Sequence, residues 1–269
     1  MSGNAREPGR STVDRLLTLL DVFDGADLTL VEIAGRSGLP LSTTHRMLGA
    51  LERWGGIERA PSGRYRVGLR LWELGTRATI PSGLRETALP LMQNLYESTH
   101  ENVQLALRTG HDALVIERLT GPRAVRTVTE VGGRLPLHAT GVGKVLLASA
   151  PAHVVSQVQQ RGLARCTRYT LTEPGRLAAA IFATRDTGIG TVHQEMTLGT
   201  SSVAAPVTDG RGDVRAAVGI VAHSHVDVSR YASVIRDVAR EISRHVQPDA
   251  PAGRPSRPAG NRPHATDVP

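Results

Sequence analysis

Two short amphipathic segments separated by a tight turn place the strongest constraint on how this chain can fold. Leu30–Ser37 carries its apolar residues on one helical face and stops at the following glycine. Pro40 then opens a second segment, Leu41–Arg53, in which apolar residues again recur at helical spacing. An earlier apolar run, Val13–Phe23, predicts a third helix that ends at Gly25 with its apolar residues turned inward. This arrangement is typical of a helix-turn-helix, whose second helix can enter a DNA major groove.

A small hairpin follows these helices. Ile57–Arg59 and Arg64–Val67 are predicted as short strands, because the four residues between them, Ala60-Pro61-Ser62-Gly63, favour a turn. Three helices followed by a two-stranded wing predict a winged helix-turn-helix over residues 11–68. Small units of this architecture also serve as protein-docking modules, so DNA binding needs a further argument.

Positive charge supplies that argument. The chain has 32 Lys+Arg residues against 25 Asp+Glu, and every basic residue except Lys144 is arginine. Seven arginines but only two acids lie from Arg36 to Arg70, an excess that is typical of a polyanion partner. Aromatic residues make up only 3% of the chain, which disfavours base stacking on single strands and leaves double-stranded DNA as the expected partner. The predicted DNA-contacting residues are Ser42, Thr43, His45, Arg46 and Arg53 on the second helix of the motif and Arg59, Arg64 and Arg66 on the wing.

The remainder of the chain alternates between helix and strand periods. Leu69–Ala78 predicts a helix and Ile80–Gly83 breaks it, so residues 69–83 are expected to form a linker helix between two domains. After a helix at Leu84–Thr99, strands are predicted at residues 103–107, 113–117, 125–131, 202–207 and 214–221, and helices at 141–150, 152–160, 173–187 and 229–245. Their mixed order predicts an α+β sheet domain over residues 84–247. Residues 248–269 contain six prolines and predict a disordered tail.

The segment Leu135-Pro136-Leu137-His138-Ala139-Thr140-Gly141-Val142-Gly143-Lys144 carries the second motif. Gly141, Val142 and Gly143 begin a helix, so their backbone N–H groups could face an anion such as a carboxylate. A phosphate-binding Walker loop is excluded, because it needs a glycine where His138 stands. The alternative is a plain helix cap with Lys144 in a structural ion pair.

Three segments together resemble the IclR-type transcriptional regulators, named for the isocitrate lyase regulator. They are Thr12–Leu17 through Leu39–Arg46, the motif at Leu135–Lys144, and Ser202-Val203-Ala204-Ala205-Pro206-Val207 with the strand that follows at residues 216–221. The resemblance covers about residues 11–247. It implies a winged helix on DNA, a linker helix and a C-terminal GAF-like α/β domain that binds a small effector. It also implies a homodimer that can pair again into a homotetramer, and a palindromic operator.

The same resemblance implies where the effector contacts the chain. One wall of the family pocket is the start of the helix at Gly141, and the other comes from residues 192–202 and 217–221. The expected effector-binding residues are Gly141, Val142, Gly143, Val192, Glu195, Ser202, Gly219 and Val221. Some relatives that bind small keto acids carry serines where this chain has Gly219 and Val221. The pocket is therefore expected to be roomier and less polar, and to take a larger organic or aromatic acid.

Several other classes of protein are disfavoured. The single cysteine, Cys166, can form neither an internal disulfide nor a cysteine-based metal site. No apolar run of eighteen residues and no apolar leader is present, so a cytoplasmic protein is expected. The chain lacks the common catalytic signatures, and His193, His223 and His225 are more economically explained as strand-end polarity than as metal ligands. No catalytic residue, metal or cofactor is assigned.

The expected function is therefore a DNA-binding transcriptional regulator, acting as a repressor, whose operator affinity responds to a small organic acid. The alternative is a small-molecule enzyme or sensor whose winged helix binds other proteins. Turnover of a substrate, or the lack of salt-dependent duplex binding, would favour that alternative.

Overall fold

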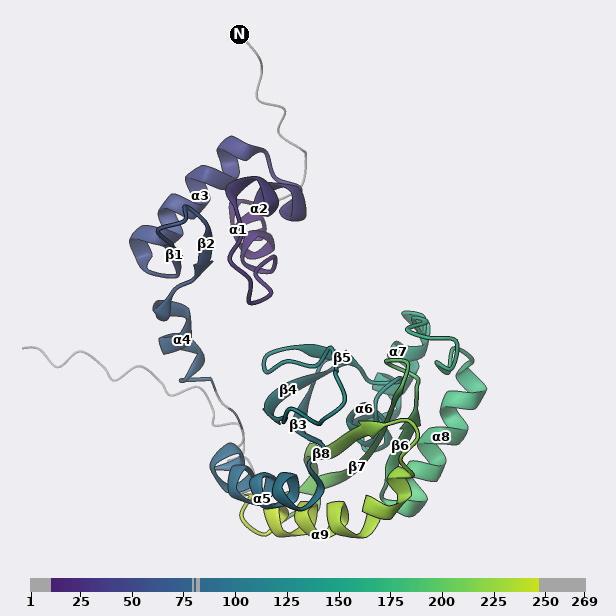
Figure 1. Ribbon diagram of the computed structural model, residues 1–269. Coiled ribbons are helices and arrows are strands. Elements are labelled where there is room, and N and C mark those ends of the chain that lie inside the picture. Colours follow the sequence, from purple (N-terminus) through teal and green to yellow (C-terminus); the bar gives the residue numbers. More distant parts are fainter. Residues whose placement is uncertain (1–10, 79, 81–82, 247–269) are drawn as a thin grey trace, which may run out of the picture. The chain divides into compact units, whose positions relative to one another are not determined.

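A computed structural model describes residues 11–78, 80 and 83–246 (Figure 1). The tail predicted at 248–269 lies outside the described residues. The chain divides into two compact units, Met1–Thr79 and Ile80–Pro269, each with its own core. In the part of the chain that is described, no helix is both long enough and apolar enough to cross a bilayer.

The N-terminal unit is the predicted winged helix-turn-helix. Its elements are α1 (Thr12–Leu20), α2 (Leu30–Ser37), α3 (Leu41–Trp54), β1 (Ile57–Arg59), β2 (Tyr65–Val67) and α4 (Leu69–Gly75). Local signals set these boundaries: Thr29 and Glu32 form a reciprocal capping box at the start of α2, and Gly38 ends it in the left-handed conformation at φ 68°. The wing strands pair in antiparallel fashion, and Leu28 bridges to Tyr65, so the wing is attached to the chain just before α2.

The core of this unit differs from the expectation at α1. Leu19, Ile33 and Leu48 are completely buried, but Val13 and Leu17 are 64% and 53% exposed. The prediction that both side chains turn inward is therefore wrong. The predicted helix end at Gly25 is also wrong, because α1 already ends at Leu20. A nine-residue helix offers one face to a small core, and Leu19 lies on that face while Val13 and Leu17 lie outside it.

The C-terminal unit has the predicted α+β fold, built around one antiparallel sheet with strand order β5-β4-β3-β8-β7-β6. The strands are β3 (Asn102–Thr109), β4 (Asp112–Leu119), β5 (Arg134–Pro136), β6 (Gly190–His193), β7 (Thr200–Thr208) and β8 (Val214–His223). The helices are α5 (Leu84–Thr99), α6 (Gly141–Ala148), α7 (Ala152–Gln160), α8 (Pro174–Thr187) and α9 (Ala232–Ser243), with a 3-10 turn, η1, at Val228–Tyr231.

The predicted strand at 125–131 is wrong, and two short edge strands, β5 and β6, were not predicted. Gly132 and Gly133 exchange backbone hydrogen bonds with Val115, and β5 continues this pairing, so the outer edge of β4 is already occupied. Residues 125–131 therefore form a loop. Its carbonyl groups at Val125 and Thr129 accept hydrogen bonds from sheet side chains instead of from a neighbouring strand.

Helices cover both faces of the sheet (Figure 1). On one face α5 and α9 lie side by side and pack on residues such as Val203 and Ile220. On the opposite face, here called the α6 face, α6 and α8 pack on residues such as Ala204 and Ala217. Since side chains alternate along a strand, every second residue of β3, β7 and β8 points to the α6 face. The predicted effector-binding residues on β7 and β8 belong to that set.

Candidate functional site

The exposed face of α3 carries most of the predicted DNA-contacting residues. Ser42, His45, Arg46 and Arg53 are exposed and Thr43 is half-buried. The opposite face of the helix supplies Thr44, Met47, Leu48 and Leu51 to the core. The helix is therefore held by one side, which leaves hydroxyl, imidazole and guanidinium groups free to meet base edges and phosphates.

The three wing arginines differ in how much of their hydrogen-bonding capacity is already used. Arg64 donates from Nε to Asp27 O (2.8 Å) and from Nη2 to Glu32 Oε2 (2.9 Å), so it ties the wing to α2. Arg66 pairs with Glu58 on the opposite strand at 3.0 Å. Arg59 lies over the Tyr65 ring, and no acidic partner of Arg59 is present among the described residues. Contacts to a duplex are therefore expected mainly from α3 and Arg59.

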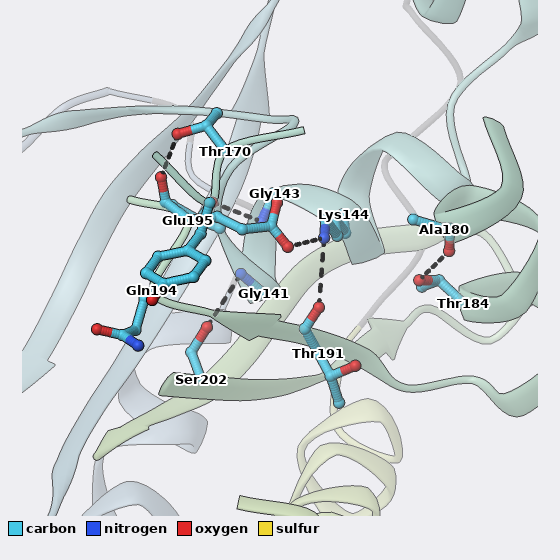
Figure 2. Close-up of polar contacts among 12 residues, drawn as sticks. Gly141, Gly143, Lys144, Thr170, Ala180, Thr184, Thr191, Gln194, Glu195 and Ser202 are labelled. Carbon is cyan, nitrogen blue, oxygen red and sulfur yellow. Dashed lines mark hydrogen bonds and ion pairs between the residues drawn. The ribbon is translucent and has the colours of Figure 1, made fainter. Parts of the chain in front are cut away.

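The start of α6 places the predicted anion-binding N–H groups in a buried position, where side-chain hydroxyls already accept from Gly141 and Gly143. Thr140 caps the helix, and its Oγ1 accepts from Gly143 N at 3.1 Å. Ser202 Oγ on β7 accepts from Gly141 N at 3.2 Å, which brings two of the predicted residues together (Figure 2). An anion at this helix end would first have to displace the hydroxyls of Thr140 and Ser202.

The expectation that Gly219 on β8 makes the pocket roomier is wrong. A Cβ atom at this position would lie 2.9 Å from Val142 Cγ1 and 3.2 Å from the Cβ of Ala204. The space left by the missing side chain is filled by Val142, because the glycine lets α6 approach the sheet closely.

Lys144 and Glu195 form a buried ion pair beside this helix end. Their side chains are 3% and 9% exposed, and Lys144 Nζ lies 2.6 Å from Glu195 Oε1 and 3.4 Å from the carbonyl oxygen of Thr191 (Figure 2). Burial lowers the pKa of the Lys144 ammonium, and the charge of Glu195 opposes that shift. The structure therefore has the alternative arrangement for this segment, a capped helix with Lys144 in an ion pair. Oε1 of Glu195 thus pairs with Lys144, while its buried Oε2 has no hydrogen-bond partner among the described residues.

Three of the predicted effector-binding residues are neighbours across strands of the α6 face. Val192 on β6 pairs with Ser202 on β7, and Ser202 pairs with Val221 on β8. The next residue in this row is Asn102 on β3. The adjacent row runs from Ala204 through Gly219 to Gln104 on β3 and Arg118 on β4.

Asn102, Gln104 and Arg118 were not predicted as site residues. Asn102 and Gln104 are 2% and 4% exposed, and each lies beside a predicted residue on β8. The local signal that could have found them is a pair of amides inside an otherwise apolar strand, because a buried polar side chain needs a partner. What the sequence could not indicate is that β3 lies next to β8, more than a hundred residues away.

The edge strand β6 borders an open cavity of about 620 Å³. Its lining includes Val192 and Glu195 together with His193, Ser201 and His225. His193 Nδ1 lies 2.8 Å from Ser201 Oγ, while the rings of His223 and His225 stack on each other 5.3 Å apart. Among the described residues, no three His, Cys, Asp or Glu side chains come together in a way that could hold a metal ion.

Comparison with known families matches nearly the whole described chain. Residues 12–61 match the IclR helix-turn-helix domain, and residues 77–244 match the bacterial transcriptional regulator IclR C-terminal domain. The chain is 32% identical over 252 residues to the HTH-type transcriptional regulator BhcR of Paracoccus denitrificans, covering 91% of this chain and 90% of the relative. It is 30% identical over 245 residues to the HTH-type transcriptional repressor AllR of Escherichia coli, covering 88% and 90%.

Solved structures agree with this match. An IclR homologue from Microbacterium hydrocarbonoxydans, crystallised with 4-hydroxybenzoate, is similar with a TM-score of 0.80 at 31% identity, covering 87% of this chain and 98% of that one. The Thermotoga maritima IclR is similar with a TM-score of 0.68 at 26% identity, covering 87% and 98%.

Proposed function

Because the chain belongs to the IclR family of bacterial transcriptional regulators, we propose that its N-terminal unit represses transcription by binding a palindromic operator as a homodimer. The observation that supports this proposal is the exposed face of α3, where Arg46 and Arg53 have no acidic partner among the described residues. Unpaired arginines on a helix of this motif suit the guanine edges and phosphates of a major groove.

Exposed apolar side chains support the homodimer. On α4, Leu69 and Trp72 are 69% and 67% exposed, and on α1 Val13 and Leu17 are also exposed. Apolar side chains that the unit itself leaves uncovered are typical of protein–protein interfaces. Sedimentation velocity at micromolar concentration should give the mass of a dimer, with a tetramer at higher concentration. A species that stays at 28.7 kDa would contradict the proposal.

The C-terminal unit is proposed to bind an organic acid, and aromatic carboxylates are the first class to test. A relative of 31% identity was crystallised with 4-hydroxybenzoate. The α6 face of this chain combines apolar residues such as Val192 and Val221 with the buried amides of Asn102 and Gln104. Such a mixture of apolar walls and a few polar groups is typical of small-molecule sites.

The proposal can be tested with an operator duplex selected from a random pool by the wild-type protein. Fluorescence anisotropy should show specific binding that weakens steeply as salt increases, because phosphate contacts release counterions. Adding 4-hydroxybenzoate should change the operator affinity by about 5- to 150-fold, the usual size of such coupling. If no duplex is enriched, or if binding is independent of salt, the DNA-binding role is wrong for this chain.

A further inference from the structure

Arg118 on β4 is a half-buried arginine of the C-terminal unit. We propose that Arg118, with Gln104 beside it on β3, recognises the carboxylate of the effector. This inference rests on the proposed function, since it concerns the same pocket. It assigns recognition of the carboxylate to Arg118 on β4 and not to the start of α6.

The register of the sheet places both residues beside the predicted site. Gln104 pairs with Gly219 on one side and with Arg118 on the other. Directly opposed residues in a sheet point to the same face, and neighbouring strands lie about 4.8 Å apart. Gly219 contacts Val142 of α6, so Gln104 and Arg118 share the α6 face. The Arg118 Cα atom therefore lies about two strand spacings, or roughly 10 Å, from that of Gly219.

Arg118 lacks a negatively charged partner in the part of the chain that the structure describes. Among the described residues, no carboxylate lies within ion-pair distance of its guanidinium group. The adjacent acid, Glu117, points to the opposite face, where its Oε2 pairs with Arg85 at 2.8 Å. A half-buried cation without a counterion is costly, which makes an external anion a natural partner.

The hydrogen bonds of Arg118 leave one edge of the guanidinium group without a hydrogen-bond partner among the described residues. Nη1 donates to the carbonyl oxygen of Thr129 in the loop at 120–133. Nε is buried and has no hydrogen-bond partner within residues 11–78, 80 and 83–246, and the same holds for Oγ1 of Thr127 in that loop. Nε together with Nη2 forms the edge that binds carboxylates through two parallel hydrogen bonds. The donor geometry required for an organic acid is thus present and unused.

The start of α6 is less suited to the same task. Its Gly141 and Gly143 N–H groups are bonded to Ser202 and Thr140. A carboxylate that bound these two N–H groups would have to break both contacts, whereas binding at Arg118 satisfies an Nε that has no partner in the described part of the chain. The competing explanation for Arg118 is purely structural, namely that it holds the loop through Thr129.

A comparison of an acid with its uncharged amide separates recognition of charge from support of the loop. Calorimetric titrations use 4-hydroxybenzoate and 4-hydroxybenzamide against wild type, Arg118→Gln and Arg126→Gln. Arg126 is an exposed arginine in the same loop and controls for a general loss of positive charge. Circular dichroism and melting temperature establish that each variant is folded.

Wild type and Arg126→Gln should bind the acid at least tenfold more tightly than the amide. Arg118→Gln should bind the acid about 10- to 100-fold more weakly than wild type does, while its affinity for the amide stays within about twofold. An equal loss for acid and amide would overturn the inference, because Arg118 would then act only on the loop. Unchanged acid binding by Arg118→Gln would overturn it while leaving the proposed function intact. If wild type binds neither compound but still binds its operator, the proposed effector class fails together with this inference.

Discussion

Val142 on α6 occupies the space that Gly219 leaves on β8, since a Cβ atom at position 219 would come within 2.9 Å of Val142 Cγ1. The glycine thus sets how closely α6 approaches the sheet, and so where Gly141 meets Ser202. The pair is internal packing, so a side chain at position 219 would need space that Val142 now fills.

Gly219→Ala is therefore expected to destabilise the protein by about 1–3 kcal/mol, the usual cost of inserting a methyl group into a packed core. Adding Val142→Ala should relieve the overlap, so that the double variant is more stable than the sum of the two single changes predicts. Urea unfolding of the four proteins measures this coupling. Strict additivity would mean that Val142 and Gly219 do not constrain each other.

Breaking the buried pair of Lys144 and Glu195 should be more costly. Lys144→Met leaves a buried carboxylate without its cation and is expected to lower the free energy of unfolding by about 3–5 kcal/mol. The double variant Lys144→Met/Glu195→Leu removes both charges and should recover most of that loss. Equilibrium denaturation gives both values. A loss below 1 kcal/mol for Lys144→Met alone would contradict the buried position of the pair.

Arg46 and Arg64 are expected to respond differently to truncation. Arg46→Ala should weaken binding to the selected operator by about 1–3 kcal/mol while leaving the fold unchanged, because it removes a contact to a base edge. Arg64 already bonds to Glu32 and to Asp27 O, so Arg64→Ala should have a smaller effect on operator affinity. Anisotropy titrations at constant salt compare the two variants. Equal losses would show that the wing contributes as much as α3 does.

Acid stability should depend on Asp209, which is buried beside Arg215 at 2.7 Å. Burial by itself raises the pKa of this carboxyl group, but hydrogen bonds from Arg215 and from the backbone of Arg211 and Asp213 together bring it below the ordinary value of 3.8. A depressed pKa stabilises the folded state above the unfolded pKa, and that contribution is lost as the pH falls through the folded value.

Asp209→Asn should accordingly reduce stability at neutral pH, and the difference from wild type should shrink as the pH falls below 3.8. Thermal unfolding of both proteins between pH 2 and pH 7 measures this difference. A gap between the two melting temperatures that stays constant over the whole range would contradict the shift.

Part of this structure follows from local sequence alone. The boundaries of the helix-turn-helix follow from local signals: the capping pair Thr29 and Glu32, the glycine at the end of α2, and Pro40 before α3. Thr140 likewise marks the first turn of α6. Caps and turns depend on the residues within one helical turn, so the amino-acid sequence is sufficient to identify them.

The loop at 125–131 shows where local reasoning fails. Its alternating apolar residues predicted a strand, but an extended segment becomes a strand only where a neighbour offers free backbone groups. Gly132, Gly133 and β5 occupy the edge of β4 first. The same limit applies to α6: the N–H groups of Gly143 and Gly141 are available in the local sequence but bond to Thr140 and to the distant Ser202.

The sequence by itself thus determined the family, the winged helix with its exposed α3 face, the α+β class of the second unit and the membership of Ser202 and Val221 in one region. Only the tertiary structure decided that Gln104 and Arg118 lie in the same row as Gly219, and that Val142 fills the space at that glycine. The physical reason is that strand pairing and the filling of volume join residues far apart in the chain, and neither leaves a periodic pattern in the sequence.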